Sequence, residues 1–253
     1  MTPDQYLLSV LTKYQIATGT GSLPYKAGQS LYSVIKEWAR DHLNEVLFSG
    51  SYAKGTGIKG GTDVDLFISL NSNTPETLKE VYNKLYTYLS TKGYRPRYQN
   101  VSIGLNHLGC SVDLVPAKKQ SGNTNDHSIY NRRQGSWIQT NVHEHIKFVK
   151  DSQRINEIRA LKIWRKLNNL NFSSFYLELV VIRALSGKTT SQPANNFLDT
   201  MRFLQNELTS ARIIDPANSN NIVSDENSFA EKQQIVVAAR SSLSKATWEE
   251  IIW

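Results

Sequence analysis

The spacing of apolar residues changes along the chain, from a mixture of helix-like and strand-like periods to a helix-like period alone. Near the N-terminus, apolar residues recur three and four apart after Thr2-Pro3 and again over residues 31–39, which predicts two helices. Runs rich in β-branched and other apolar residues predict four strands: one ending near Ser49, one over Val64–Ser69, one over about Arg95–Leu105 and one over Gly109–Pro116.

A well-patterned helix separates two of these strands. We expect it to begin at Thr74-Pro75 and to end at Gly93. After Pro116 a polar stretch predicts a loop, and from about Val142 onward the pattern is helical. The predicted fold class is therefore α/β (α+β), with a mixed-sheet lobe over residues 1–140, a helical lobe over residues 141–253, and a ligand cleft between them.

Two acidic residues separated by one Val stand at the head of the Val64–Ser69 strand. Side chains alternate between the faces of a strand, so Asp63 and Asp65 project the same way, with Cα atoms roughly 6.5 Å apart. Two ionised carboxylates so placed need a compensating cation, typically Mg²⁺ with oxygen ligands and substrate phosphates. Because a lone D-x-D also suits a turn residue followed by a solvated strand residue, the neighbouring motifs decide between the two interpretations.

The neighbouring motifs favour the metal site. Asp113 lies in the last predicted strand, which Pro116 is expected to end, and acids from two strands can converge on one sheet edge as a two-metal site requires. Gly50-Ser51 lies in a glycine-studded loop whose N–H groups and hydroxyl suit the β- and γ-phosphates of a nucleoside triphosphate (NTP), and Thr56 is expected to add a phosphate or metal contact. The stretch therefore indicates metal-assisted chemistry on an NTP.

This set of motifs resembles the DNA polymerase β-type nucleotidyltransferases. The resemblance is carried by Gly50-Ser51, Gly55-Thr56, Asp63-Val64-Asp65 and Val112-Asp113-Leu114-Val115-Pro116. Segments beginning at Leu161 (LKIWRK), Ser173 (SSFYLELVVIRAL) and Ile213 (IIDPANSNNIVSD) are similar to one branch of that superfamily. The branch contains archaeal-type CCA-adding enzymes, 2′-5′ oligoadenylate synthetases, cyclic GMP-AMP synthase and the bacterial CD-NTases, and the CD-NTases are the nearest resemblance.

The resemblance implies nucleotidyl transfer assisted by two Mg²⁺ ions, for which Mn²⁺ can substitute. Asp63, Asp65 and Asp113 would hold the ions and align a ribose hydroxyl with the α-phosphate of an NTP. Asp113 would lie nearest the acceptor and help to remove the hydroxyl proton.

The resemblance also assigns roles in the helical lobe. Lys162 would reach the triphosphate, Ser174 would bond a phosphate, and Phe175, in place of the commoner Tyr, would stack on the donor base. A solvated basic helix face and a core position for Phe175 are the structural alternatives. For Glu178, four residues after Ser174 in an apolar helix, we expect a salt bridge.

The acceptor decides the function. If it is a second nucleotide, the product is a cyclic or linear oligonucleotide second messenger of bacterial antiphage-type signalling; this is the primary prediction. If it is a tRNA 3′ end, the protein is a CCA-adding or tRNA-modifying enzyme, which a length of 253 residues disfavours. A toxin-like transferase that modifies tRNA or protein stays open. A catalytically silent nucleotide or RNA sensor is the alternative of another class, and the three acids argue against it.

Composition indicates partners and location. The formal net charge of +7 suggests an anionic partner, nucleotide or nucleic acid. The single Cys110 excludes an internal disulfide and suits a reducing cytoplasm, and no stretch approaches the ~18 apolar residues of a membrane span. The expected location is cytoplasmic, without a membrane. NTP substrates, a separate effector protein that responds to the product, and an RNA or protein activator are the candidate partners.

Overall fold

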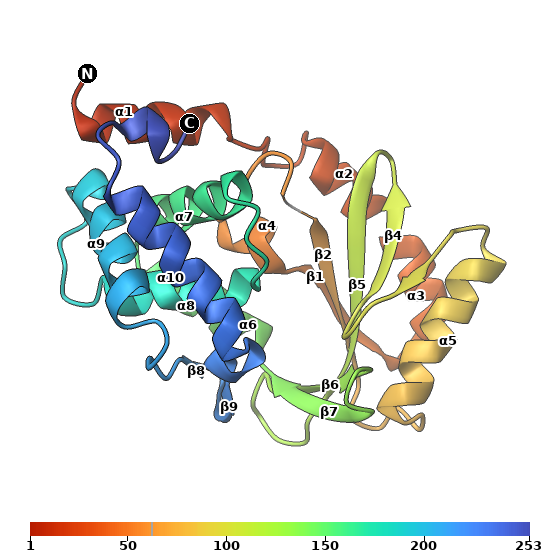
Figure 1. Ribbon diagram of the computed structural model, residues 1–253. Helices are drawn as coiled ribbons and strands as arrows, with labels where there is room; N and C mark the ends of the chain where they lie inside the picture. Colours follow the sequence, from red (N-terminus) through yellow and green to blue (C-terminus); the bar gives the residue numbers. More distant parts are fainter. Residues whose placement is uncertain (62) are drawn as a thin grey trace. The chain divides into compact units, whose positions relative to one another are not determined.

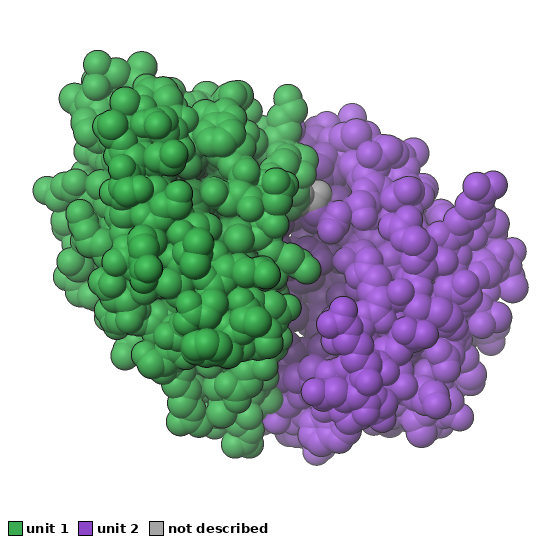
Figure 2. Space-filling view, viewed as in Figure 1, with its two compact units in different colours: residues 1–16, 55–61, 147–253 green, residues 17–54, 62–146 purple. Residues whose placement is uncertain are grey.

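The computed structural model describes residues 1–61 and 63–253, which divide into two compact units (Figures 1 and 2). Unit 1 comprises residues 1–16, 55–61 and 147–253, and unit 2 comprises residues 17–54 and 62–146. The sequence placed the division at 140/141 and kept the whole N-terminal part in one lobe. The structure groups two early segments with the helical unit because Leu7, Leu11 and Ile58 are buried in its core.

Unit 2 is built on one mixed sheet. Within the described residues, seven strands pair in the order β1-β2-β5-β4-β3, with β6 on β5 and β7 on β6. The strands are β1 (Leu43–Phe48), β2 (Val64–Leu70), β3 (Arg97–Tyr98), β4 (Ile103–His107), β5 (Cys110–Lys119), β6 (His127–Asn131) and β7 (Ser136–Thr140). β2 and β5 run parallel, and the other described pairs of this sheet are antiparallel, which confirms the mixed sheet expected from the sequence.

Helices cover one face of this sheet (Figure 1). They are α2 (Leu23–Ser30), α3 (Tyr32–Ala39) and α5 (Leu78–Thr91). Leu66 of β2 and Leu114 of β5 are buried in the same hydrophobic cluster as residues of these helices. Because successive side chains of a strand point to opposite faces, Asp65 and Asp113 lie on the face that these helices leave uncovered.

Helix α5 begins at Leu78, so the expected start at Thr74-Pro75 was too early. Thr77 is the N-cap: its hydroxyl accepts the N–H of Glu80, and the Glu80 carboxylate accepts the N–H of Thr77. Such a capping box satisfies two backbone donors that would otherwise lack partners. Thr74 belongs to the preceding turn, where its hydroxyl donates to the carbonyl of Asn71.

The strand expected over about 95–105 is two strands, β3 and β4, joined by a tight turn. Tyr82 of α5 holds this turn: its hydroxyl lies 2.8 Å from the carbonyl oxygen of Gln99 and 3.0 Å from that of Ser102. The same hydroxyl accepts the N–H of Gln99 at 3.1 Å. The contacts of Tyr82 with the turn at Gln99 and Ser102 therefore separate the expected strand into β3 and β4.

Strand β5 continues through Pro116 to Lys119, so the predicted end at Pro116 was wrong. The pairing with β4 ends at Leu114 and the pairing with β6 begins at Ala117. Pro116 falls between them, where its missing N–H breaks no ladder on that side. The β6–β7 hairpin was not predicted from the sequence, and neither was helix α2, which Ser22 caps through the N–H of Tyr25.

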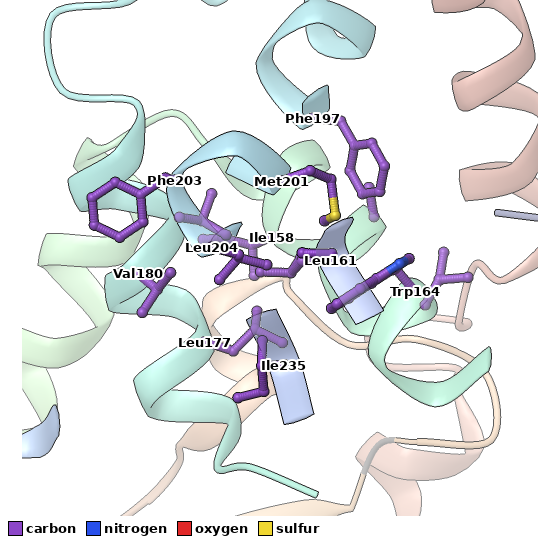
Figure 3. Close-up of a cluster of buried hydrophobic side chains, with 14 of the residues drawn as sticks. Ile158, Leu161, Trp164, Leu177, Val180, Phe197, Met201, Phe203, Leu204 and Ile235 are labelled. Carbon is purple, nitrogen blue, oxygen red and sulfur yellow. The ribbon is translucent and has the colours of Figure 1, made fainter. Parts of the chain in front are cut away.

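Unit 1 is helical around one hydrophobic core (Figure 3). Its described elements are α1 (Pro3–Lys13), α7 (Ile155–Leu167), α8 (Ser174–Ala184), α9 (Pro193–Asn206), α10 (Phe229–Leu243) and the small hairpin β8 (Ile214–Asp215) and β9 (Asn218–Ile222). The division between the units falls within α6 (Val142–Asp151). The helices predicted after Val142 are thus confirmed. No helix in residues 1–61 or 63–253 is long and apolar enough to cross a membrane.

The core of unit 1 predicts where truncation destabilises the protein. Leu177 of α8 is 0% exposed in this core, so Leu177→Ala should lower the free energy of unfolding by about 2–5 kcal/mol. Val237 of α10 is 61% exposed, and Val237→Ala should change it by less than about 0.5 kcal/mol. Urea denaturation followed by tryptophan fluorescence measures both, and equal losses would contradict the assignment.

Candidate active site

Two carboxylates lie side by side on the uncovered face of the sheet. In the parallel pair of β2 and β5, Asp65 is directly opposite Asp113. Neighbouring strands are about 4.8 Å apart, and paired residues point to the same face, so the two side chains are neighbours. Asp63 precedes β2 and is exposed. The structure therefore brings the three predicted acids into one region of unit 2.

The predicted phosphate-binding segment contacts one of these carboxylates, that of Asp65. Gly50 begins the short helix α4 (Gly50–Lys54), with a positive φ of 55°. A Cβ atom at Gly50 would lie 1.8 Å from Oδ2 of Asp65, so no other residue fits there. The N–H of Ser49 donates to the backbone carbonyl of Asp65 at 2.8 Å. Ser51 follows within α4, half-buried, so the segment expected as a loop is a helix start pressed against Asp65.

The charge of Asp113 is shaped by its surroundings. Burial and, to a smaller extent, the negative charge of Asp63 raise the pKa of its carboxyl to about 6. A hydrogen bond from Gln99 and the positive charge of Arg97 act in the opposite direction. The amide Nε2 of Gln99 donates to Oδ1 of Asp113 at 2.9 Å. Gln99 was not identified from the sequence, because the contact depends on the turn between β3 and β4.

The carboxylates of unit 2 suit a divalent cation that binds together with the phosphates of a substrate. Within the described part of the chain, no three His, Cys, Asp or Glu side chains stand ready as a complete metal-binding cluster. The site nevertheless offers hard carboxylate oxygens on neighbouring strands and a negative charge that raises the pKa of Asp113. Mg²⁺ is commonly held by one or two carboxylates together with substrate phosphates. The donor set therefore suits Mg²⁺ or Mn²⁺.

A second group of predicted residues lines a pocket in unit 1. The pocket has a volume of about 330 Å³. Its lining consists of Ile58, Gly60, Gly61, Lys162, Arg165, Lys166, Leu170, Asn171, Phe172 and Ser174. Lys162 and Ser174, which we expected to contact the phosphates of one NTP, thus line the same pocket. With three basic side chains in its wall, the pocket suits an anionic ligand.

Two further basic residues of this pocket were not assigned a role from the sequence. The guanidinium of Arg165 donates to Oγ of Ser174 at 3.1 Å and to the carbonyl of Phe172 at 2.6 Å. Lys166 donates to the carbonyl of Gly60 at 3.0 Å. The signal was present in the basic helix face, but which of its residues line the pocket depends on the loops that they reach.

The aromatic residue in the pocket wall is Phe172. The Arg165 guanidinium lies over its ring, 5.5 Å from the centroid. The predicted stacking residue, Phe175, is half-buried and packs against the hydrophobic core of unit 1.

Lys162 is also one member of a buried polar network. It is 2% exposed, and its ammonium lies 2.7 Å from Oε1 of Glu178 and 2.9 Å from Oγ1 of Thr56. The Thr56 hydroxyl, 0% exposed, donates to the same Glu178 oxygen at 2.7 Å. The expected salt bridge of Glu178 is confirmed. In this arrangement the Thr56 hydroxyl holds the Lys162–Glu178 pair, where the sequence led us to expect a phosphate or metal contact.

The mixed sheet and its paired acids define the class of protein: the fold is that of the polymerase β-like nucleotidyltransferases. A solved structure of Escherichia coli MS115-1 CdnC with ATP is similar, with a TM-score of 0.75 and 19% identity over 98% of this chain and 96% of that one. The chain belongs to the Second Messenger Oligonucleotide or Dinucleotide Synthetase (SMODS) family, whose model matches residues 1–153.

The chain is similar in sequence to two relatives that differ in their named activity. The cyclic AMP-AMP-AMP synthase of Escherichia coli (strain MS 115-1) is 24% identical over 178 residues, which are 61% of this chain and 56% of that protein. The CCA-adding enzyme of Thermoplasma acidophilum is 27% identical over 179 residues, 62% of this chain and 77% of that protein. The similarity to the synthase thus spans little more than half of its length.

The buried pair predicts an asymmetry between single and double substitutions. Glu178→Leu leaves the Lys162 ammonium buried without its counter-charge, so the free energy of unfolding should fall by about 3–5 kcal/mol. Adding Lys162→Met removes this unpaired ammonium, so the double variant should recover most of the lost free energy of unfolding. Urea denaturation measures both.

An exposed ion pair is the matched control. Lys147 and Asp151 are partners on the surface of α6, and Asp151→Ala should cost less than about 1 kcal/mol. A double variant no more stable than Glu178→Leu alone would contradict the interpretation.

The raised pKa of Asp113 predicts how stability depends on pH. Between pH 3.8 and about 6, the folded metal-free protein binds a proton at this carboxyl that the unfolded chain lacks. Its contribution to the free energy of unfolding therefore falls as pH rises through that window. Asp113→Asn should stabilise the protein above the window and have little effect below it. Urea denaturation in EDTA at several pH values measures this, and an effect independent of pH would contradict it.

Proposed function

We propose that this chain is a divalent-metal-dependent nucleotidyltransferase that joins NTPs into a cyclic or linear oligonucleotide second messenger and releases pyrophosphate. The observation that carries the proposal is the pairing of Asp65 with Asp113 on parallel strands, with Gly50 against Asp65. Membership of the SMODS family supports it. A catalytically silent sensor would not need two carboxylates held next to each other, where their like charges repel.

In the proposed reaction, a ribose hydroxyl of the acceptor attacks the α-phosphorus of an NTP. The new P–O bond forms as the bond to the departing pyrophosphate breaks. Two Mg²⁺ ions, or Mn²⁺ in their place, supply Lewis-acid stabilisation of the developing charge. Asp63, Asp65 and Asp113 would hold these ions through their carboxylate oxygens. Asp113 would help to remove the proton of the attacking hydroxyl.

Each unit contributes phosphate contacts in this proposal. Gly50 and Ser51 offer backbone N–H groups and a hydroxyl next to Asp65. The pocket of unit 1 offers Arg165, Lys166 and Ser174, and Lys162, paired with Glu178, lines its wall. We infer that this pocket binds phosphate groups of an NTP. The charge of the pocket would then offset the charge of pyrophosphate as it leaves.

The donor base is proposed to stack on an aromatic ring of unit 1. Phe175 is the ring assigned by resemblance, and Phe172 is the ring that lines the pocket. Stacking on an aromatic side chain contributes roughly 1–3 kcal/mol per base. Alanine at the ring that stacks should therefore raise the KM for the NTP, and alanine at the other ring should not.

The product is proposed to act on a separate effector protein, in antiphage-type signalling, with an RNA or protein activator upstream. ATP is the first NTP to test, because the synthase relative is named for an all-adenylate product. The similarity to a CCA-adding enzyme favours an RNA 3′ end as the second candidate acceptor.

One experiment separates these acceptors. The purified protein is incubated with α-labelled NTPs and Mg²⁺ or Mn²⁺, first alone and then with tRNA, and the products are treated with phosphatase. We expect phosphatase-resistant label in a small product without RNA. Label that appears only on added tRNA would move the protein to the CCA-adding class, and no incorporation in either case would favour the sensor.

The carboxylates predict a loss of turnover without a loss of fold. Asp63→Ala/Asp65→Ala should reduce label incorporation by at least about 10²–10³-fold, because the site then lacks most of its charge for the cations. Asp41→Ala/Asp151→Ala removes the same charge from two exposed positions and should leave turnover unchanged. Circular dichroism checks the fold of both. Substantial residual activity in the first variant would refute the mechanism.

A further inference from the structure

An amide from the turn between β3 and β4 reaches the third carboxylate across the sheet. The register places Arg97 of β3 opposite Gly104 of β4, Gly104 opposite Asp113 of β5, and Asp113 opposite Asp65 of β2. One row therefore crosses four strands on the uncovered face. Gln99 extends over this row, and its Nε2 lies 2.9 Å from Oδ1 of Asp113.

The contact is possible because the row contains a glycine. A Cβ atom at Gly104 would lie 2.5 Å from Nε2 of Gln99 and 3.0 Å from Oδ1 of Asp113. Gly104 has no positive φ, so backbone conformation does not require glycine here. The missing side chain is the space that the amide occupies.

The orientation of the amide is set by a second hydrogen bond. Ser102 donates its hydroxyl to Oε1 of Gln99 at 2.6 Å. With Oε1 engaged, Nε2 is the end of the amide that faces Asp113. The turn itself is closed independently of the amide, by the Gln99 N–H to the Ser102 carbonyl at 3.1 Å and by the Tyr82 hydroxyl. The amide is thus not needed to form the turn.

We propose that Gln99 is a positioning residue for nucleotidyl transfer: its amide holds one oxygen of Asp113 so that the other is presented in a fixed orientation to the cation and the attacking hydroxyl. This inference rests on the proposed function. The negative charge of Asp63 repels the Asp113 carboxylate. A neutral donor on Asp113 limits rotation of the carboxylate without adding a charge that would compete with the cation. Ser102 supports the same arrangement through its hydrogen bond to Gln99 and through its own contact with Asp113.

The test replaces the amide by an apolar group of similar size. In Gln99→Leu, we expect kcat to fall by about 10–100-fold, the usual cost of removing a hydrogen-bond partner of a metal ligand. The KM for the NTP should change little. Mn²⁺ affinity, measured by electron paramagnetic resonance with a non-hydrolysable ATP analogue, should fall by a similar factor. The melting temperature of the metal-free protein should stay close to that of the wild type.

Gln120→Leu is the matched control. Its Nε2 also donates to a side chain, Oγ of Ser128 at 3.1 Å, but Gln120 lies just beyond the end of β5. Lys119, the last residue of β5, is ~20 Å along the strand from Asp113. We expect wild-type kcat and Mn²⁺ affinity. Ser102→Ala is a milder second variant, which should lower the same two quantities to a smaller extent and serves if Gln99→Leu does not fold.

The outcomes separate this inference from the proposed function. If Asp113→Asn lowers Mn²⁺ affinity and neither Gln99→Leu nor Ser102→Ala does, the positioning role is overturned and the metal site stands. If Asp113→Asn leaves Mn²⁺ affinity unchanged, the metal site and the positioning role both fail. Equal losses in Gln99→Leu and Gln120→Leu would also overturn the inference, because the effect would not be specific to the row.

Discussion

The parallel pairing of β2 with β5 places two carboxylates of like charge next to each other, and much of unit 2 is arranged around that constraint. Like charges directly opposite each other on adjacent strands are destabilising. Burial, and after it the negative charge of Asp63, raises the pKa of Asp113 and adds to the cost of ionising it. Gly50 brings backbone close to Asp65, and the side chain of Gln99 donates a hydrogen bond from a neutral amide to Asp113.

Unit 1 contains a buried acid and a buried base that are paired with each other. Lys162 and Glu178 are paired within the protein, and Thr56 bonds to both, so the charges are satisfied internally. Because desolvation offsets the attraction of a buried pair, such a pair contributes little net stability, while the loss of one partner is costly. Thr56 lies in the segment Gly55–Gly61, far in sequence from α7 and α8, so the network ties that segment into the helical unit.

The local signals in the sequence were sufficient for most elements. The alternation in β2 and the helical periods of α1, α5 and α8 carry through to the structure, because each depends on residues within one segment. Two of the errors share a cause. Tyr82 breaks the expected strand over 95–105, and the gap between the β4 and β6 pairings lets β5 pass through Pro116. Both effects come from partners distant in sequence.

The sequence by itself determined the chemistry: three acids and a Gly-Ser pair at a spacing that suits a divalent cation and an NTP, because residue type and strand periodicity are local properties. Only the tertiary structure decided which atoms meet. It set Asp65 opposite Asp113, pressed Gly50 against Asp65, brought Gln99 to Asp113 and committed Thr56 to Lys162 and Glu178. Those contacts depend on strand register and on packing between distant segments, which no local pattern specifies.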